Sequence, residues 1–192
     1  GGDEAFNKKL DELFSMSSEL GEEASMDITG LIGQYAHGNE PSHHTTYMYA
    51  YSGEHYKIAD KVRYINNELY TDKPDGLSGN EDCGQMSAWY ILSSIGFYPV
   101  NPSNGAYVFG SPLFDEVTLN IPGQNKFKIS AKNNSDKNIY IQSVSLNGED
   151  YKYSYITHKQ ILEGGELEFV MGPNPNKNFG SEKKYRPKSI VY

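Results

Sequence analysis

Hydrophobic positions in the first half of the chain recur every three or four residues, which is the spacing of an amphipathic α-helix. Helices are expected around residues 6–14, 58–69 and 86–95, with a shorter one at about 44–52. Loops rich in Gly, Pro, Asn and Asp separate them. The apolar positions on which the three longer helices depend are Phe6, Leu10, Leu13, Phe14, Ile58, Val62, Ile65, Leu69, Met86, Trp89, Leu92 and Ile95.

After residue 99 the hydrophobic period falls to two, which is typical of β-strands. A shift in the alternation between Ile141 and Val144 indicates a β-bulge. Asn147 and Gly148 favour a type I′ hairpin turn between two neighbouring strands. The expected strands are 117–121, 127–131, 139–146, 151–156 and 167–171.

Helices followed by strands, without alternation, predict an α+β fold rather than a βαβ fold. We expect an all-α part over residues 1–100 and an all-β part over residues 101–192, the latter an antiparallel β-sandwich. Four helices with such long loops are few for a helical domain of its own. The helices are therefore expected to belong to a larger helical assembly, part of which lies outside this chain.

Composition narrows the classes of partner. The chain has 17 basic and 25 acidic residues, which leaves no basic surface for nucleic acid or anionic membranes. No apolar run approaches the roughly 20 residues of a membrane span. The 16 tyrosines suit stacking on sugar rings, although tyrosine also fills β-sheets. A single cysteine excludes an internal disulfide and leaves the compartment open.

Glu81 and Asp82 form an adjacent carboxylate pair in a glycine-rich loop at 71–84. Hydrolysis of a glycosidic bond requires one carboxylic acid and one carboxylate that activates water or attacks the sugar. Neighbouring side chains diverge, so this pair needs a partner across the sugar. Alternatively, Asp82 caps the helix that follows, and a carboxylate held there stays ionised, as a general base must.

Asn39 and Glu40 lie in the second glycine-rich loop and offer oxygen ligands that suit calcium. His43 and His44 would suit zinc, but adjacent residues cannot both face one metal from a helix. The alternative for this segment is a turn followed by a helix that Ser42 caps.

Three further side chains favour structural roles. Cys83 has the acidic residue Asp82 beside it and no assigned base, so we expect a small buried residue rather than a nucleophile. Trp89 belongs to a helical apolar stripe and is expected in the core. His37 is expected to have a surface or hydrogen-bonded structural role rather than a catalytic one.

Four ordered blocks resemble glycoside hydrolase family 92. Together with weaker similarity that continues through the β half to residues 172–175, they cover most of the chain. They correspond to only the C-terminal quarter or so of a family member. The blocks are GQYAHGNEPSHH at 33–44, GNEDCGQMSAW at 79–89, GFYPV at 96–100 and GSPLF at 110–114.

The resemblance implies an N-terminal β-domain and an (α/α)6 barrel with the active site between them. This chain would supply the last barrel helices and the closing strands, and its partner would be the missing N-terminal part of the same enzyme. Family members are calcium-dependent inverting exo-α-mannosidases that remove non-reducing-end mannose from glycans. An α-1,2 type that degrades N-glycans in the periplasm or outside the cell is therefore expected.

The resemblance also implies roles for the residues that occupy the positions of the family's site residues. Asp82 resembles the general base, and the position of Asn80 often bears a second acidic residue, so its assistance is reduced here. Asn39 and Glu40 resemble calcium-site residues, whereas Glu81 and His43 are expected to bind substrate. The general acid has no counterpart in this chain, which alone is expected to be inactive.

A hypothesis from another class is a non-catalytic carbohydrate-binding or structural module, in which the loop carboxylates only cap helices. Tight mannose binding by this chain alone would favour that interpretation.

Overall fold

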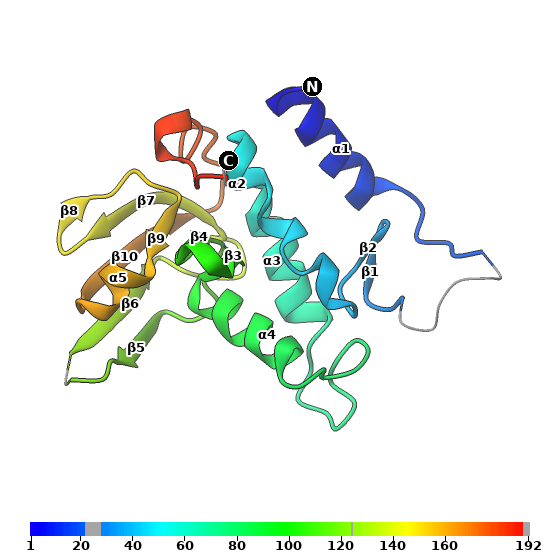
Figure 1. Cartoon of the computed structure of the whole chain (residues 1–192), viewed down its shortest axis with the longest axis horizontal. Helices are drawn as coiled ribbons and strands as arrows, with labels where there is room; N and C mark the ends of the chain where they lie inside the picture. Colours follow the sequence, from blue (N-terminus) through cyan, green and yellow to red (C-terminus); the bar gives the residue numbers. More distant parts are fainter. Residues whose placement is uncertain (22–27, 124, 190–192) are drawn as a thin grey trace.

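A computed structural model describes residues 1–21, 28–123 and 125–189. Helices dominate the first half of the chain and strands the second, and the two halves lie on opposite sides of the molecule (Figure 1). The helices are α1 (Asp3–Ser15), α2 (Tyr49–Ser52), α3 (Lys57–Glu68), α4 (Gln85–Ile95) and α5 (His158–Leu162). The strands are β1 (Leu31–Ile32), β2 (Tyr35–Ala36), β3 (Phe97–Asn101), β4 (Ala106–Phe109), β5 (Glu116–Asn120), β6 (Lys126–Lys132), β7 (Tyr140–Leu146), β8 (Glu149–Asp150), β9 (Tyr155–Thr157) and β10 (Gly165–Gly172).

The three longer helices α1, α3 and α4 form where the apolar periodicity predicts them, and their stripes meet in one core around Trp89. The short helix expected at 44–52 is divided into a 3-10 turn, Thr45–Tyr47, and the single turn α2. None of the helices in the described ranges is long and apolar enough to cross a membrane.

The strands form a five-stranded sheet, β5-β6-β10-β7-β8, a three-stranded sheet, β3-β4-β9, and a two-stranded sheet, β1-β2. Alternation within β3 and β4 gives the smaller sheet two apolar faces. Phe97 and Phe109 pack into the core of the five-stranded sheet, whereas Tyr98 and Val108 pack into the core of the helices. The small sheet therefore lies between the helices and the larger sheet.

Two local predictions in the strand half are confirmed. Asn147 and Gly148 have φ angles of 53° and 82°, as a type I′ turn requires. The pairing register between β7 and β10 shifts at Val170 and Met171, which places the expected bulge at Gln142 of β7.

The pairing of two strands differs from expectation. The turn leads only into the short strand β8, and β9 pairs with β4 in the other sheet instead. The five-stranded sheet is not purely antiparallel, because β10 runs parallel to β6. β10 follows a long connection through β9 and α5, and only such a crossover lets it return in the same direction as β6.

Strands β3 and β4 were not expected from the sequence, since Pro99 and the short turn before Ala106 interrupt their alternation. The boundary expected at residue 100 falls inside β3. The division into two domains stays a prediction.

Candidate active site

Two loops that bear the candidate residues lie against each other: the Asn39 loop (residues 29–44) and the Asp82 loop (residues 70–84). Glycine makes this approach possible. A Cβ atom on Gly38 would lie 2.0 Å from Thr29 Oγ1 and 2.7 Å from the Ser78 carbonyl oxygen, and one on Gly79 would lie 2.8 Å from the Gly38 oxygen. The loops are thus in direct backbone contact, although the sequence separates them by two helices.

The carboxylate that caps α4 is that of Glu81, not that of Asp82. Its Oε1 accepts a hydrogen bond from the Ser87 backbone N–H at 3.0 Å, and its Oε2 accepts one from the Ser87 hydroxyl at 2.9 Å. An acidic side chain at a helix N-terminus also interacts favourably with the helix dipole. The helix-capping role considered for Asp82 therefore belongs to Glu81. The Asp82 carboxyl remains available for a different function.

Asp82 meets Glu40 across the two loops. The pKa of Asp82 is raised from its ordinary value, first because its carboxyl shares a hydrogen bond with Glu40 and also because the charge of Glu40 repels a second negative charge. Asp82 is exposed and Glu40 is partly exposed. The fold thus brings the expected general base beside an expected calcium ligand.

The backbone around Asp82 is unusual. Asp82, Cys83 and Gly84 have consecutive positive φ angles of 49°, 58° and 92°. This left-handed run turns the chain sharply before α4 and points Asp82 away from the helix cap. Cys83 is exposed rather than buried as expected, because the turn stands out from the helical core.

A buried polar cluster supports the two loops from beneath. His37 Nδ1 lies 2.8 Å from the Tyr35 hydroxyl, and its Nε2 lies 2.7 Å from the Tyr70 hydroxyl. His43 Nε2 lies 2.9 Å from the His37 carbonyl oxygen, and Gln85 Nε2 lies 3.2 Å from His43 Nδ1. Burial lowers the pKa of His37 to about 3, and the nearby His43 adds to this effect.

Sequence reasoning gave Tyr70 and Gln85 no role, because their partners lie far away along the chain. The structural role expected for His37 agrees with its hydrogen bonds. His43 is buried and both of its ring nitrogens have partners within the protein, so its expected contact with substrate stays a prediction. Asn39 and Asn80 are both exposed on the two loops.

Within the described residues, no group of three or more His, Cys, Asp or Glu side chains is placed to hold a metal ion. The Asp82–Glu40 pair would supply two carboxylate ligands on one side of a bound calcium ion. A calcium ion at this point would need carbonyl, amide or water oxygens to complete its six to eight ligands.

Comparison with known proteins identifies the family. A model of the glycosyl hydrolase family 92 catalytic domain matches residues 1–173. An uncharacterized secreted glycosidase of Arthroderma benhamiae is 31% identical over 156 residues, which cover 80% of this chain and 20% of that protein.

Comparison with solved structures agrees with this family match. A family GH92 α-mannosidase of Bacteroides thetaiotaomicron has a TM-score of 0.90 and 42% identity, over 100% of this chain and 25% of that one. The complex of that α-mannosidase with mannoimidazole has a TM-score of 0.92 and 43% identity, over 98% and 25% of the respective chains. An inverting family GH92 mannosidase of the same organism has a TM-score of 0.85 and 36% identity, over 98% and 27%.

The chain thus spans about a fifth of the curated relative and about a quarter of the solved structures that it matches. The family match covers residues 1–173, and it includes both loops of the candidate site. This chain belongs to glycoside hydrolase family 92.

Proposed function

We propose that this chain is the C-terminal part of a calcium-dependent inverting exo-α-mannosidase of α-1,2 type, which removes non-reducing-end mannose from glycans. Within that enzyme it contributes the general base Asp82, and Asn39 and Glu40 as part of the calcium site. The observation that carries the proposal is the meeting of Asp82 and Glu40 across two loops that are distant in the sequence.

Two carboxyl groups in contact repel each other when both are ionised, so they favour either a shared proton or a cation. A hard divalent cation that takes oxygen ligands suits this pair. Asn39 and Glu40 would hold calcium together with ligands from outside this chain. When bound, calcium would fix the hydroxyl groups of the terminal mannose and favour distortion of its ring.

Glu40 bound to a cation would leave Asp82 ionised and free to take a proton from water. Inversion requires the general acid to lie roughly 6.5–9.5 Å from the base, on the opposite face of the sugar. The exposure of Asp82 in this chain is consistent with an acid supplied by the rest of the protein. Asn80, where relatives of this type often carry an acid, would give the base only indirect help.

The wider architecture follows from the same proposal. Helices α1 to α4 would be the last helices of an (α/α)6 barrel, and the two sheets would form a β-sandwich against it. The secreted glycosidase among the relatives supports a location outside the cytoplasm.

The test is Asp82→Asn in the full-length protein, assayed on an α-1,2-linked mannobiose. We expect kcat to fall by about 10²–10⁴, because a positioned general base contributes that much. Asp75→Asn is the matched control, since it removes an exposed carboxylate from the same loop. Near-normal turnover by the Asp82 variant, with folding and calcium binding intact, would contradict the base assignment. Binding of mannobiose by the wild-type protein without hydrolysis would favour a carbohydrate-binding module.

A further inference from the structure

The buried cluster beneath the two loops is a set of directed hydrogen bonds. The Tyr70 hydroxyl donates to the Met86 carbonyl oxygen at 3.0 Å, and that carbonyl lies in the first turn of α4. A hydroxyl has one proton to donate. Tyr70 must therefore accept its second hydrogen bond, from His37 Nε2, at 2.7 Å.

This assignment fixes the proton on His37. A neutral imidazole with its proton on Nε2 has an unprotonated Nδ1, which accepts from the Tyr35 hydroxyl at 2.8 Å. His43 follows the same rule. Its Nε2 faces the His37 carbonyl oxygen, which only accepts, and its Nδ1 accepts from Gln85 Nε2.

The cluster joins the two halves of the candidate site. His37 lies in the Asn39 loop, two residues before Asn39, and Tyr70 begins the Asp82 loop. Tyr70 also forms an isolated β-bridge with Leu77, which closes the base of that loop. The Tyr70 hydroxyl thus contacts the Asn39 loop and the first turn of α4, while the Tyr70 backbone closes the base of the Asp82 loop.

We propose that Tyr70 is a positioning residue, whose hydroxyl holds the Asp82 loop in register with the Asn39 loop through its hydrogen bond with His37. The inference rests on the proposed function, in which Asp82 must face Glu40 at a fixed distance. Groups that orient functional side chains from one layer away typically matter 10–100-fold for activity or metal affinity.

Tyr35 supplies a matched control, because it bonds the other nitrogen of the same imidazole. It lies in strand β2 of the Asn39 loop, and its hydroxyl bonds His37 of the same loop and also Thr46. Neither partner belongs to the Asp82 loop. Tyr35 is buried in the helical core and Tyr70 packs half-buried against the same core, and each loses one hydroxyl on change to Phe. They differ in whether the hydrogen bond that is removed joins the two loops.

The experiment compares Tyr70→Phe with Tyr35→Phe in the full-length protein. We expect Tyr70→Phe to lower kcat by about 10–100-fold with little change in KM, and its crystal structure to show Asp82 and Glu40 apart from each other. Tyr35→Phe should lose thermal stability by a similar amount, keep kcat and leave Asp82 beside Glu40. Equal kcat values for the two variants, or Asp82 still beside Glu40 in Tyr70→Phe, would overturn the inference.

A second pair of variants tests the role of the imidazole. His37→Gln keeps a side-chain N–H near the position of Nε2 and should retain most of kcat, whereas His37→Asn is too short and should match Tyr70→Phe. Equal losses of kcat in the two variants would overturn the assignment of the proton. A wild-type protein without mannosidase activity would instead refute the proposed function, while the crystal structures would still decide whether Tyr70 positions the loop.

Discussion

At the scale of single residues, the candidate site depends on backbone conformations that most side chains disfavour. A left-handed conformation costs a non-glycine residue roughly 1–2 kcal/mol, and Asp82 and Cys83 adopt it one after the other. Strain of this kind persists where the surrounding structure enforces it, and it is frequent at functional sites. Here it directs one carboxylate to the helix cap and the next toward Glu40.

Variants of two glycines distinguish the effect of close packing between the loops from the effect of a left-handed backbone conformation. We predict that Gly38→Ala lowers the free energy of unfolding by about 1–3 kcal/mol and parts the two loops, because its Cβ would meet Thr29 and Ser78. Gly84→Ala adds a Cβ in open space at a φ of 92° and should cost only about 1–2 kcal/mol, from conformation alone.

Thermal denaturation of both variants measures the loss of stability, and crystal structures of both show whether the two loops stay in contact. Loops that stay together in Gly38→Ala would contradict the packing argument. A separation of the loops in Gly84→Ala would do so as well.

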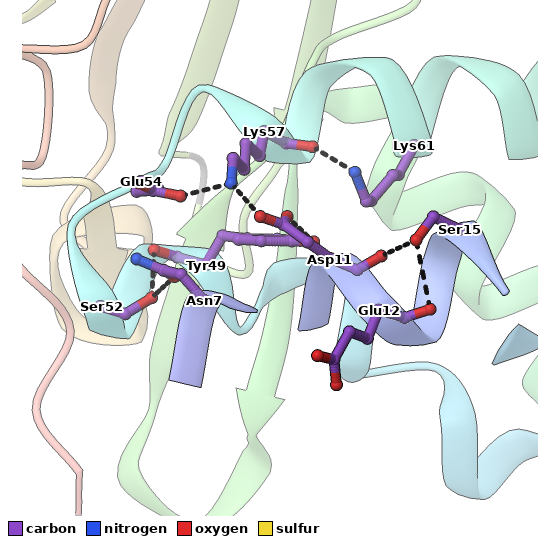
Figure 2. A network of polar contacts seen from close by, with 9 residues as sticks. All are labelled: Asn7, Asp11, Glu12, Ser15, Tyr49, Ser52, Glu54, Lys57 and Lys61. Carbon is purple, nitrogen blue, oxygen red and sulfur yellow. Dashed lines mark hydrogen bonds and ion pairs between the residues drawn. The ribbon is translucent and has the colours of Figure 1, made fainter. Parts of the chain in front are cut away.

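At the scale of elements, helix α1 is attached to α2 and α3 by polar bonds as well as by its apolar stripe. Figure 2 shows Asp11 of α1 between Lys57 and Tyr49. Lys57 Nζ lies 2.6 Å from Asp11 Oδ2, and the Tyr49 hydroxyl donates to Asp11 Oδ1 at 2.9 Å. Asn7, one turn earlier, accepts from the Ser52 hydroxyl of α2.

The pH dependence of this ion pair follows from the pKa of Asp11. Burial raises that pKa, but hydrogen bonds from Lys57 and Tyr49 outweigh burial and leave it below its ordinary value. A depressed folded-state pKa contributes stability above the unfolded pKa of about 3.9, and this stability is lost as the pH falls through the folded value. The Asp11 side chain is 47% exposed, so solvent screens the pair and its contribution is modest.

We predict that Asp11→Asn lowers the free energy of unfolding by about 0.5–1 kcal/mol at neutral pH. The difference from wild type should shrink toward zero on acidification below the unfolded pKa, as followed by urea denaturation across a pH series. Glu12→Gln is the control on the same helix, because Glu12 only approaches exposed Lys8 and Lys9 at 4.0 Å and 3.9 Å. A pH-independent loss of stability in the Asp11 variant would contradict the ion-pair explanation.

At the scale of the whole molecule, Arg63 connects the helices to the sheets. From α3 its Nε donates to Ser111 Oγ at 2.9 Å, and its Nη2 donates to the Pro112 carbonyl oxygen at 2.5 Å and to the Asn134 side chain. Ser111 donates in turn to the Ile139 carbonyl oxygen at 2.7 Å. One buried guanidinium therefore holds the connections that precede β5 and β7.

Arg63→Met should lower the free energy of unfolding by about 2–4 kcal/mol, since the change leaves buried acceptors without a donor. Lys128→Met is the matched control: it removes a cation 2.9 Å from Glu116, but from the exposed face of the sheet, and should cost only about 0–1 kcal/mol. Equal losses of stability in chemical denaturation would show that Arg63 has no special connecting role.

Many of the helices, strands and turns could be predicted from the sequence, because the patterns that indicate them are local. The apolar stripe of α3 and the turn at Asn147 and Gly148 depend on residues within a few positions of one another. The same holds for the bulge of β7, which the break in alternation indicates. The motif around Asp82 likewise pointed to a carboxylate chemistry and to a family.

Only the tertiary structure decided which residues meet. The meeting of Asp82 with Glu40, the bond between Tyr70 and His37, and the parallel pairing of β10 with β6 all join segments that are distant in the chain. The closure of long loops depends on packing throughout the fold, and no local pattern encodes it. The sequence by itself therefore determined the three longer helices, the strands of the five-stranded sheet except β8, and the candidate groups. Packing decided the partners of these elements and groups and assigned the helix cap to Glu81.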